Sequence, residues 1–181
     1  MSRFDHSLGV MLLLRKFKTP LNEQIAGLLH DISHTAFSHV VDFVFGSEKT
    51  HDYQDKKMLQ AFELQGINRI LKKYQINPAE ILNEKNFPLL ERKLPDLCAD
   101  RIDYTLREPW FNRLSKIKPK EFLNHLKVDK KHFVFVDKNW AKKFGLVYLK
   151  LDQVTWCTPL QASLYQILAE AIKIGLKKNY H

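Results

Sequence analysis

Apolar residues recur at intervals of three and four along most of this chain, and that periodicity is typical of amphipathic helices. The first such run lies between residues 8 and 17. Ser2 and Asp5, three residues apart, have the spacing of a capping box at its start. Thr19 and Pro20 predict the start of a second helix, because threonine favours the N-cap and proline the first helical position.

Later segments repeat the helical period and are separated by glycine and proline. Helices are predicted at residues 36–45, from about 51 to 65, at 67–75 and 78–85, from Pro95 or Asp96 to Pro109, from Trp140 onward, and at 160–178. The pattern changes within residues 126–137, where β-branched and aromatic residues follow the turn-like Asp129-Lys130-Lys131. The sequence therefore predicts an all-α helical bundle with one small β-hairpin near residues 126–137, formed by a single domain, residues 1–181.

Composition narrows the class of protein. Hydrophobic residues make up 45% of the 181 positions, as in ordinary globular chains. The apolar run at residues 10–14 is too short to cross a bilayer, and no small-residue cleavage site follows it. The two cysteines, Cys98 and Cys157, do not form a disulfide framework and are expected to be reduced. We therefore expect a cytoplasmic protein without a membrane partner.

The formal charge of +9 is concentrated in one region. Residues 111–150 contain eleven Lys or Arg and three Asp or Glu, a local balance of +8. Such a region can steer anionic ligands, nucleotides or nucleic acid toward the protein. A lysine-rich segment is also typical of a plainly solvated surface, and the sequence leaves both interpretations open.

Candidate chemistry lies in four short segments. They are Arg3-Phe4-Asp5-His6-Ser7, His30-Asp31-Ile32-Ser33-His34, Ser38-His39 and Asp100-Arg101-Ile102-Asp103-Tyr104. Neighbouring helical residues project about 100° apart, so His30 and Asp31 can converge on one ion only at a helix end, where the pattern puts them. Two imidazoles with two carboxylates suit manganese, iron or zinc, and magnesium is also compatible. The alternative is that the histidines are hydrogen-bonded core residues and the aspartates are helix caps.

These four segments resemble the sequence motifs of the HD-domain metal-dependent phosphohydrolases. The order His6, His30-Asp31, Asp100 matches their H…HD…D signature. Residues 4–10, 28–31, 37–39 and 99–104 are similar to the branch that contains the deoxynucleoside triphosphate triphosphohydrolases (dGTPase-like), and the similarity extends from residue 3 to about residue 175. The resemblance implies an all-α core of about five helices and one divalent metal ion held by His6, His30, Asp31 and Asp100.

The resemblance also implies roles for other residues of the site. Histidine titrates near neutral pH and can donate a proton to a leaving group, so His34 and His39 are acid/base candidates. The family pattern adds His51 as a third catalytic histidine and Asp42 as the support of one of the three. It places Arg3, Arg101, Tyr104 and Glu108 at the substrate, and Glu108 departs from the aspartate that the family often has there. Asp103 lies four residues before Arg107 and is expected to support it.

The expected reaction is cleavage of a deoxynucleoside triphosphate to nucleoside and triphosphate. Two alternatives stay open: hydrolysis of a nucleoside monophosphate or other phosphoester, and an inactive metal-binding module that binds nucleic acid through residues 111–150. Members of the branch usually have a substantial stretch before the first motif, and here the motif begins at Arg3, so the chain is expected to be short at its N-terminus. The expected partners are a nucleotide substrate, nucleic acid bound weakly, and further copies in a homo-oligomer.

Overall fold

The computed structural model describes residues 2–37, 39–46 and 53–178, which are mainly helical with one small sheet. This confirms the predicted fold class. The chain forms two compact units. The first consists of Met1–Asp31 and Asn68–Leu151, and the second of Ile32–Ile67 and Asp152–His181. The assignment of residues 1–181 to a single domain stays a prediction.

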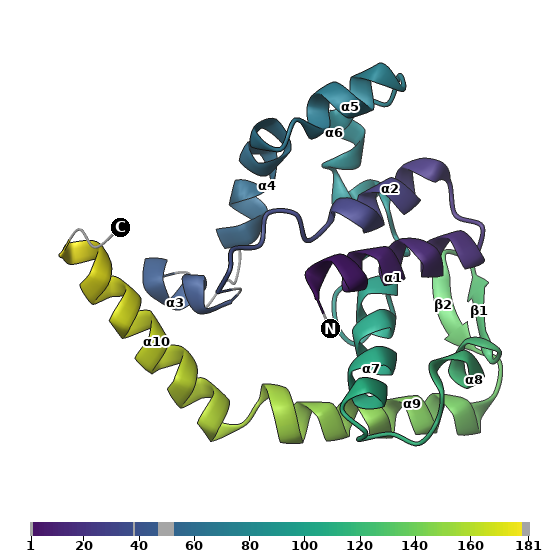
Figure 1. Cartoon of the computed structure of the whole chain (residues 1–181). Coiled ribbons are helices and arrows are strands. Elements are labelled where there is room, and N and C mark those ends of the chain that lie inside the picture. The colour runs from purple at the N-terminus through teal and green to yellow at the C-terminus, as the bar shows by residue number, and fades with distance from the viewer. Residues whose placement is uncertain (1, 38, 47–52, 179–181) are drawn as a thin grey trace. The chain divides into compact units, whose positions relative to one another are not determined.

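The helices and strands labelled in Figure 1 divide between the two units. The first unit holds α1 (Arg3–Lys16), α2 (Leu21–Leu29), α6 (Pro78–Ile81), the 3-10 helix η1 (Glu84–Asn86), α7 (Ala99–Phe111), α8 (Pro119–Leu123), β1 (Leu126–Asp129), β2 (His132–Phe135) and α9 (Lys138–Leu151), with nearly all of α5 (Ile67–Lys73). The second holds α3 (Val40–Phe45), α4 (Tyr53–Leu64), the π-helix η2 (Asp152–Trp156) and α10 (Pro159–Lys177). Among the described residues, no helix is both long and apolar enough to cross a membrane.

The first helix, α1, begins as the sequence predicts. The Ser2 side chain accepts from the Asp5 N–H at 3.1 Å, and the Asp5 carboxylate accepts from the Ser2 N–H at 3.1 Å, which completes the capping box. Val10, Leu13 and Leu14 form its buried face. Their spacing of three and four residues places them on one side of the helix, where α1 packs against α2 and α7 (Figure 1).

The predicted start of α2 is wrong by one residue. The helix begins at Leu21, and Pro20 is its N-cap without a side-chain hydrogen bond. Thr19 is buried, and its N–H donates to Leu14 O at 3.2 Å, so it closes the end of α1 instead. The Gln24 side chain donates to Thr19 O at 2.7 Å and so joins the two helices.

The predicted limits of α7 are also wrong. The helix begins at Ala99, not at Pro95 or Asp96, because a loop separates it from the preceding segment. It continues through Pro109 to Phe111. Proline removes one N–H donor from a helix, and α7 ends at Phe111, only two residues after Pro109.

The structure shifts the start of one further predicted segment, helix α3, and confirms another, the β-hairpin. Helix α3 begins at Val40, four residues later than predicted, because the Val40 N–H donates to Phe37 O in a preceding turn. The β-hairpin is confirmed: β1 and β2 are antiparallel, with Leu126 opposite Phe135. Its two turn residues, Lys130 and Lys131, have φ of 46° and 64°, the left-handed conformation that a two-residue hairpin turn requires.

Candidate metal centre

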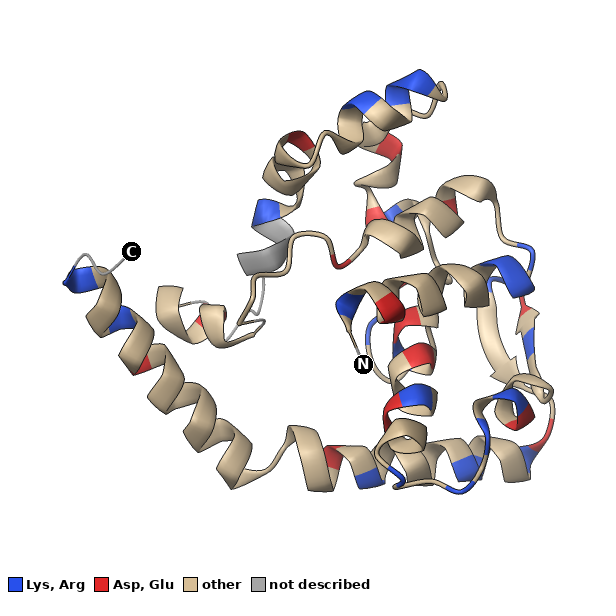
Figure 2. Ribbon diagram, in the orientation of Figure 1, with Lys and Arg blue, Asp and Glu red and all other residues tan. Residues whose placement is uncertain are grey.

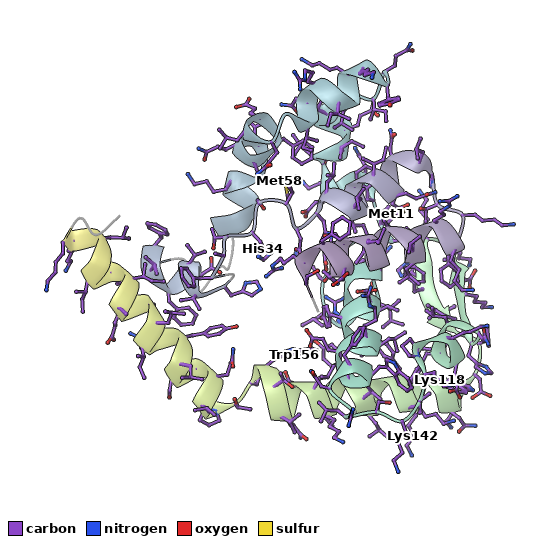
Figure 3. The ribbon with its side chains drawn as sticks, in the orientation of Figure 1. Met11, His34, Met58, Lys118, Lys142 and Trp156 are labelled. Atoms are coloured by element: carbon purple, nitrogen blue, oxygen red, sulfur yellow. The ribbon has the colours of Figure 1, made fainter. Side chains whose placement is uncertain are left out.

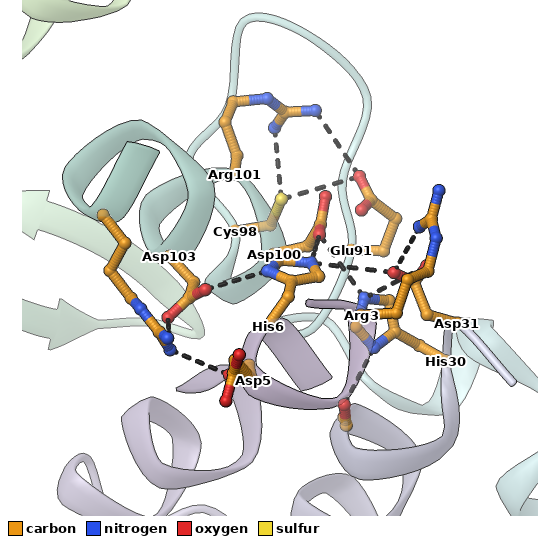
Figure 4. A network of polar contacts seen from close by, with 12 residues as sticks. Arg3, Asp5, His6, His30, Asp31, Glu91, Cys98, Asp100, Arg101 and Asp103 are labelled. Atoms are coloured by element: carbon orange, nitrogen blue, oxygen red, sulfur yellow. Dashed lines mark hydrogen bonds and ion pairs between the residues drawn. The ribbon is translucent and has the colours of Figure 1, made fainter. Parts of the chain in front are cut away.

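Three segments of the first unit bring the four predicted metal ligands together (Figure 4). His6 lies in the second turn of α1, His30 and Asp31 directly follow α2, and Asp100 is the second residue of α7. The ligand atoms of His6, His30 and Asp31 all lie within 4.8 Å of one another. Asp100 Oδ1 is 2.8 Å from His6 Nε2 and 3.4 Å from His30 Nε2. The cluster therefore draws on three backbone segments, as a catalytic metal site requires.

Hydrogen bonds orient both imidazoles toward this cluster. His6 Nδ1 donates to Asp103 Oδ2, and His30 Nδ1 donates to Gly27 O, each at 2.8 Å. Each Nε2 is thereby directed at the carboxylates, which is the usual arrangement of metal-binding histidines. His30 Nε2 is buried and makes no hydrogen bond with any described residue. A buried nitrogen that points at two carboxylates without a hydrogen bond fits a metal ion as its partner.

The electrostatics of the cluster match this assignment. Burial lowers the pKa of His6, but hydrogen bonds to Asp100 and Asp103 outweigh burial and raise the pKa to about 10. Burial also lowers the pKa of His30, but Asp100 and Asp31 outweigh burial, so the pKa is raised. For Asp100, burial raises the pKa, whereas His30 and His6 hold it well below the usual range of a carboxyl group. The neighbouring carboxylates thus favour the protonated form of both imidazoles.

The structure gives Asp103 a role that the sequence did not reveal. Its predicted contact with Arg107 is confirmed, at 3.4 Å, but the other carboxylate oxygen binds His6. Arg107 also donates to Asp5 O at 2.8 Å, so it joins α7 to α1. Gly9 makes this possible, because a Cβ atom there would overlap the side chains of Asp103 and Arg107. A glycine in the middle of a predicted helix was the only local signal of this close approach.

Two of the proposed substrate residues border the cluster and one lies further along α7. Arg3 Nη1 is 2.7 Å from Asp31 Oδ2, and the Arg3 side chain is 42% exposed. The Tyr104 ring lies 6.5 Å from the His6 ring. Glu108 is two helical turns beyond Asp100, about 12 Å along the axis. Their roles at the substrate stay predictions.

Arg101 points elsewhere. Its guanidinium donates to the backbone oxygens of Asp96 and Arg92. It also lies 3.2 Å from Cys98 Sγ and 3.4 Å from Glu91 Oε1 (Figure 4). Arg101 is buried and stabilises the loop before α7. Its assignment to substrate phosphate therefore stays a prediction that these contacts do not support.

Glu91, Cys98 and Asp100 form a second group of ligand types. Burial, followed by the charge of Glu91, raises the pKa of Cys98 to about 12, so the thiol stays protonated. Arg101 already supplies a positive charge to this group. A metal ion bound by this group would be repelled by the positive charge of Arg101.

The predicted acid/base residues belong to the second unit. The rings of His34 and His39 lie 5.3 Å apart, and His39 Nδ1 is 3.7 Å from Asp42 Oδ2. Asp42 is completely buried. His51 lies outside the described residues. The structure thus groups three of the four residues, and their catalytic roles stay predictions.

Comparison with known proteins places the chain in a family. The HD domain model matches residues 3–108. YdhJ of Bacillus subtilis, an uncharacterized protein, is 39% identical over 178 residues, which are 97% of this chain and 54% of that protein. The metal-dependent phosphohydrolase cns2 of Cordyceps militaris is 29% identical and is matched over 96% of this chain and 53% of its own.

A solved structure shares the fold. A phosphohydrolase from Bacteroides thetaiotaomicron aligns over 96% of this chain and 47% of its own, with a TM-score of 0.68 and 18% identity. This chain spans about half the length of the curated relatives YdhJ and cns2. HD domains bind divalent metal ions, and the cluster of His6, His30, Asp31 and Asp100 offers the ligand types for one. The match over residues 3–108 shows that this chain belongs to the HD domain family of metal-dependent phosphohydrolases.

Proposed function

We propose that this chain hydrolyses deoxynucleoside triphosphates to nucleoside and triphosphate. The observation that carries the proposal is the position of Arg3, which brings a permanent positive charge to 2.7 Å from a candidate metal ligand, Asp31. A phosphate ester is anionic and needs cations where charge develops during cleavage. A divalent ion, when bound, would polarise a phosphoryl oxygen.

The nucleotide part of the proposal depends on two further features. Tyr104 lies beside His6 on the face of α7 that carries Asp100, so its ring is available to a sugar near the phosphates. Burial, with the charge of Asp100 and a hydrogen bond to Tyr148, raises the pKa of Tyr104, so its hydroxyl stays protonated and neutral. The similarity of residues 99–104 to the triphosphohydrolase branch supports the same substrate class.

Product analysis by chromatography tests the proposal. Purified protein with added Mn²⁺ is incubated with deoxynucleoside triphosphates and, separately, with monophosphates. Asp31→Ala removes a candidate ligand, and Asp129→Ala, at an exposed position of the hairpin, is the matched control. We expect nucleoside and triphosphate from the parent and from Asp129→Ala, and neither from Asp31→Ala. Nucleoside and single phosphate formed from monophosphates alone would instead identify a nucleotidase.

A second candidate function, nucleic-acid binding, is favoured by the surface of residues 111–150. All eleven Lys and Arg of this segment are exposed, and none forms an ion pair with a residue that the structure describes. Eight of them lie in α8, the hairpin and α9 (Figure 2), and Arg113, Lys116 and Lys118 lie in the segment before α8. The labelled Lys142 extends away from α9 (Figure 3). Lys143 lies 4.0 Å from the Trp140 ring centre, so aromatic surface is close to the charges.

Binding of a fluorescent single-stranded oligonucleotide at several salt concentrations tests this second function. We expect affinity to fall with salt in both the parent and Asp31→Ala. The double variant Lys142→Gln/Lys143→Gln should reduce the slope of log affinity against log salt by about one for each lysine that contacts phosphate. Loss of binding in Asp31→Ala, or a slope unchanged by the double variant, would refute binding through this surface.

A further inference from the structure

Glu23 is a buried carboxylate that contacts none of the four candidate ligands. It lies in α2 and is 5% exposed. Its Oε1 accepts from the Leu89 N–H at 2.8 Å, and the next N–H, that of Leu90, donates to Phe87 O at 3.0 Å. No basic side chain in the described part of the chain forms an ion pair with it. Because an unpaired buried carboxylate is costly, its position calls for a structural or functional reason.

Leu89 and the residue after it, Leu90, also cap α7. Leu89 O accepts from the Ala99 N–H at 2.7 Å, and Leu90 O accepts from the Asp100 N–H at 3.3 Å. The first N–H groups of a helix have no partner within the helix. At α7 the N-cap residue, Cys98, makes no side-chain capping hydrogen bond. The carbonyl groups of Leu89 and Leu90 therefore take the place of a side-chain cap.

We propose that Glu23 is a positioning residue for the metal centre, on whose assignment this inference rests. Glu23 holds the Leu89-Leu90 segment by the Leu89 N–H, and the carbonyl groups of that segment set where α7 begins. Asp100 is the second residue of α7, so the same contacts set its position relative to His30. Helix α2 thus acts on the site twice: His30 directly follows its last residue, and Glu23, seven residues before His30, helps to place a ligand on another helix.

Glu23→Gln tests the proposal because it keeps the size of the side chain. The amide oxygen can still accept from the Leu89 N–H, but a neutral amide accepts a weaker hydrogen bond than a charged carboxylate does. Two quantities are measured: the Kd for Mn²⁺, from the free ion in a titration followed by electron paramagnetic resonance, and the Tm of the chelator-treated protein. We expect the Kd to rise about ten- to hundredfold, as for other residues that orient metal ligands.

Glu80→Gln is the matched control. Glu80 is exposed on α6 and accepts from the Asn22 side chain of α2 at 3.1 Å, so it also contacts α2 but not the segment before α7. Its Kd should stay within about twofold of the parent's. A role of Glu23 in stability alone would lower the Tm of Glu23→Gln and leave its Kd unchanged, and that outcome would overturn the proposal.

Asp100→Ala separates this inference from the metal centre itself. If Asp100→Ala loses Mn²⁺ binding and Glu23→Gln does not, the positioning role is wrong and the metal centre stands. If neither variant changes the Kd, the metal centre is wrong as well. Should Glu23→Gln fail to fold, Glu23→Asp decides, because it keeps the charge and withdraws it by one methylene. A weaker Mn²⁺ affinity with faster amide exchange at Ala99 and Asp100 supports the proposal, and parent-like values refute it.

Discussion

The close approach of α1 and α7 at Gly9 leads to a prediction that separates packing from metal binding. An alanine Cβ at this position would overlap Arg107 Nη1 and Asp103 Oδ1, and it would lie 2.8 Å from Asp103 Cγ. To accommodate Gly9→Ala, the Asp103 side chain must move away. Because Asp103 accepts from His6 Nδ1, we expect the substitution to disturb the orientation of His6 as well.

Two opposing effects decide the change in stability. Alanine is more favourable than glycine in a helix interior by about 0.5–1 kcal/mol. Overpacking a filled site costs about 1–3 kcal/mol. We therefore expect Gly9→Ala to lower the free energy of unfolding by ~0–2.5 kcal/mol. Loss of the hydrogen bond that orients His6 should raise the Kd for Mn²⁺ at least about tenfold.

Gly145→Ala in α9 provides the matched control, because no described atom lies within 4 Å of the Cβ position there. Only the favourable helix term remains, so this variant should gain about 0.5–1 kcal/mol, which corresponds to a rise in Tm of about 1–4 °C. The assay compares thermal melts of the chelator-treated proteins with Mn²⁺ titrations of each. The reasoning would be refuted if Gly9→Ala gained as much stability as Gly145→Ala and bound Mn²⁺ with the affinity of the parent.

Further expectations concern pH, charge and capping. The pKa of His6 is about 10 in the folded protein and 6.5 in the unfolded chain, so protonated His6 stabilises the fold. This stabilisation is complete below pH 6.5 and is lost as the pH rises through 10. The midpoint of urea unfolding of the metal-free protein should therefore fall over this range, and it should fall less in His6→Gln. Mn²⁺ binding at pH 7 should release protons from His6 and His30, as calorimetry in buffers of different ionisation enthalpy would reveal, and no release would contradict the raised pKa values. Asp103→Asn should weaken Mn²⁺ binding about tenfold or more, whereas exposed Asp129→Asn should not. Thr158→Ala should cost about 1 kcal/mol in urea unfolding, because the Thr158 side chain accepts from the Gln161 N–H at α10; parent-like unfolding would argue against this cap.

Local patterns predicted much of the fold. The Ser2–Asp5 capping box and the β-hairpin involve residues close in sequence, so their hydrogen bonds follow from spacing alone. The limits of α7 did not follow in the same way. Pro109 lies inside that helix, and its first residue depends on carbonyl groups about ten residues earlier in the chain. Local sequence patterns predict that a segment is helical more reliably than they predict the residues at which the helix begins and ends.

In the candidate site, too, the sequence predicts some features and only the tertiary structure shows the others. The sequence by itself determined which residue types are available, namely His6, His30, Asp31 and Asp100 in the order of the HD signature. Only the tertiary structure decided that Asp103, 97 residues away, orients His6, and that Arg101 turns toward the loop before α7. The Glu23–Leu89 bond spans 66 residues. Such pairings depend on how helices pack, and a periodic pattern specifies which face of a helix is buried but not which partner it meets.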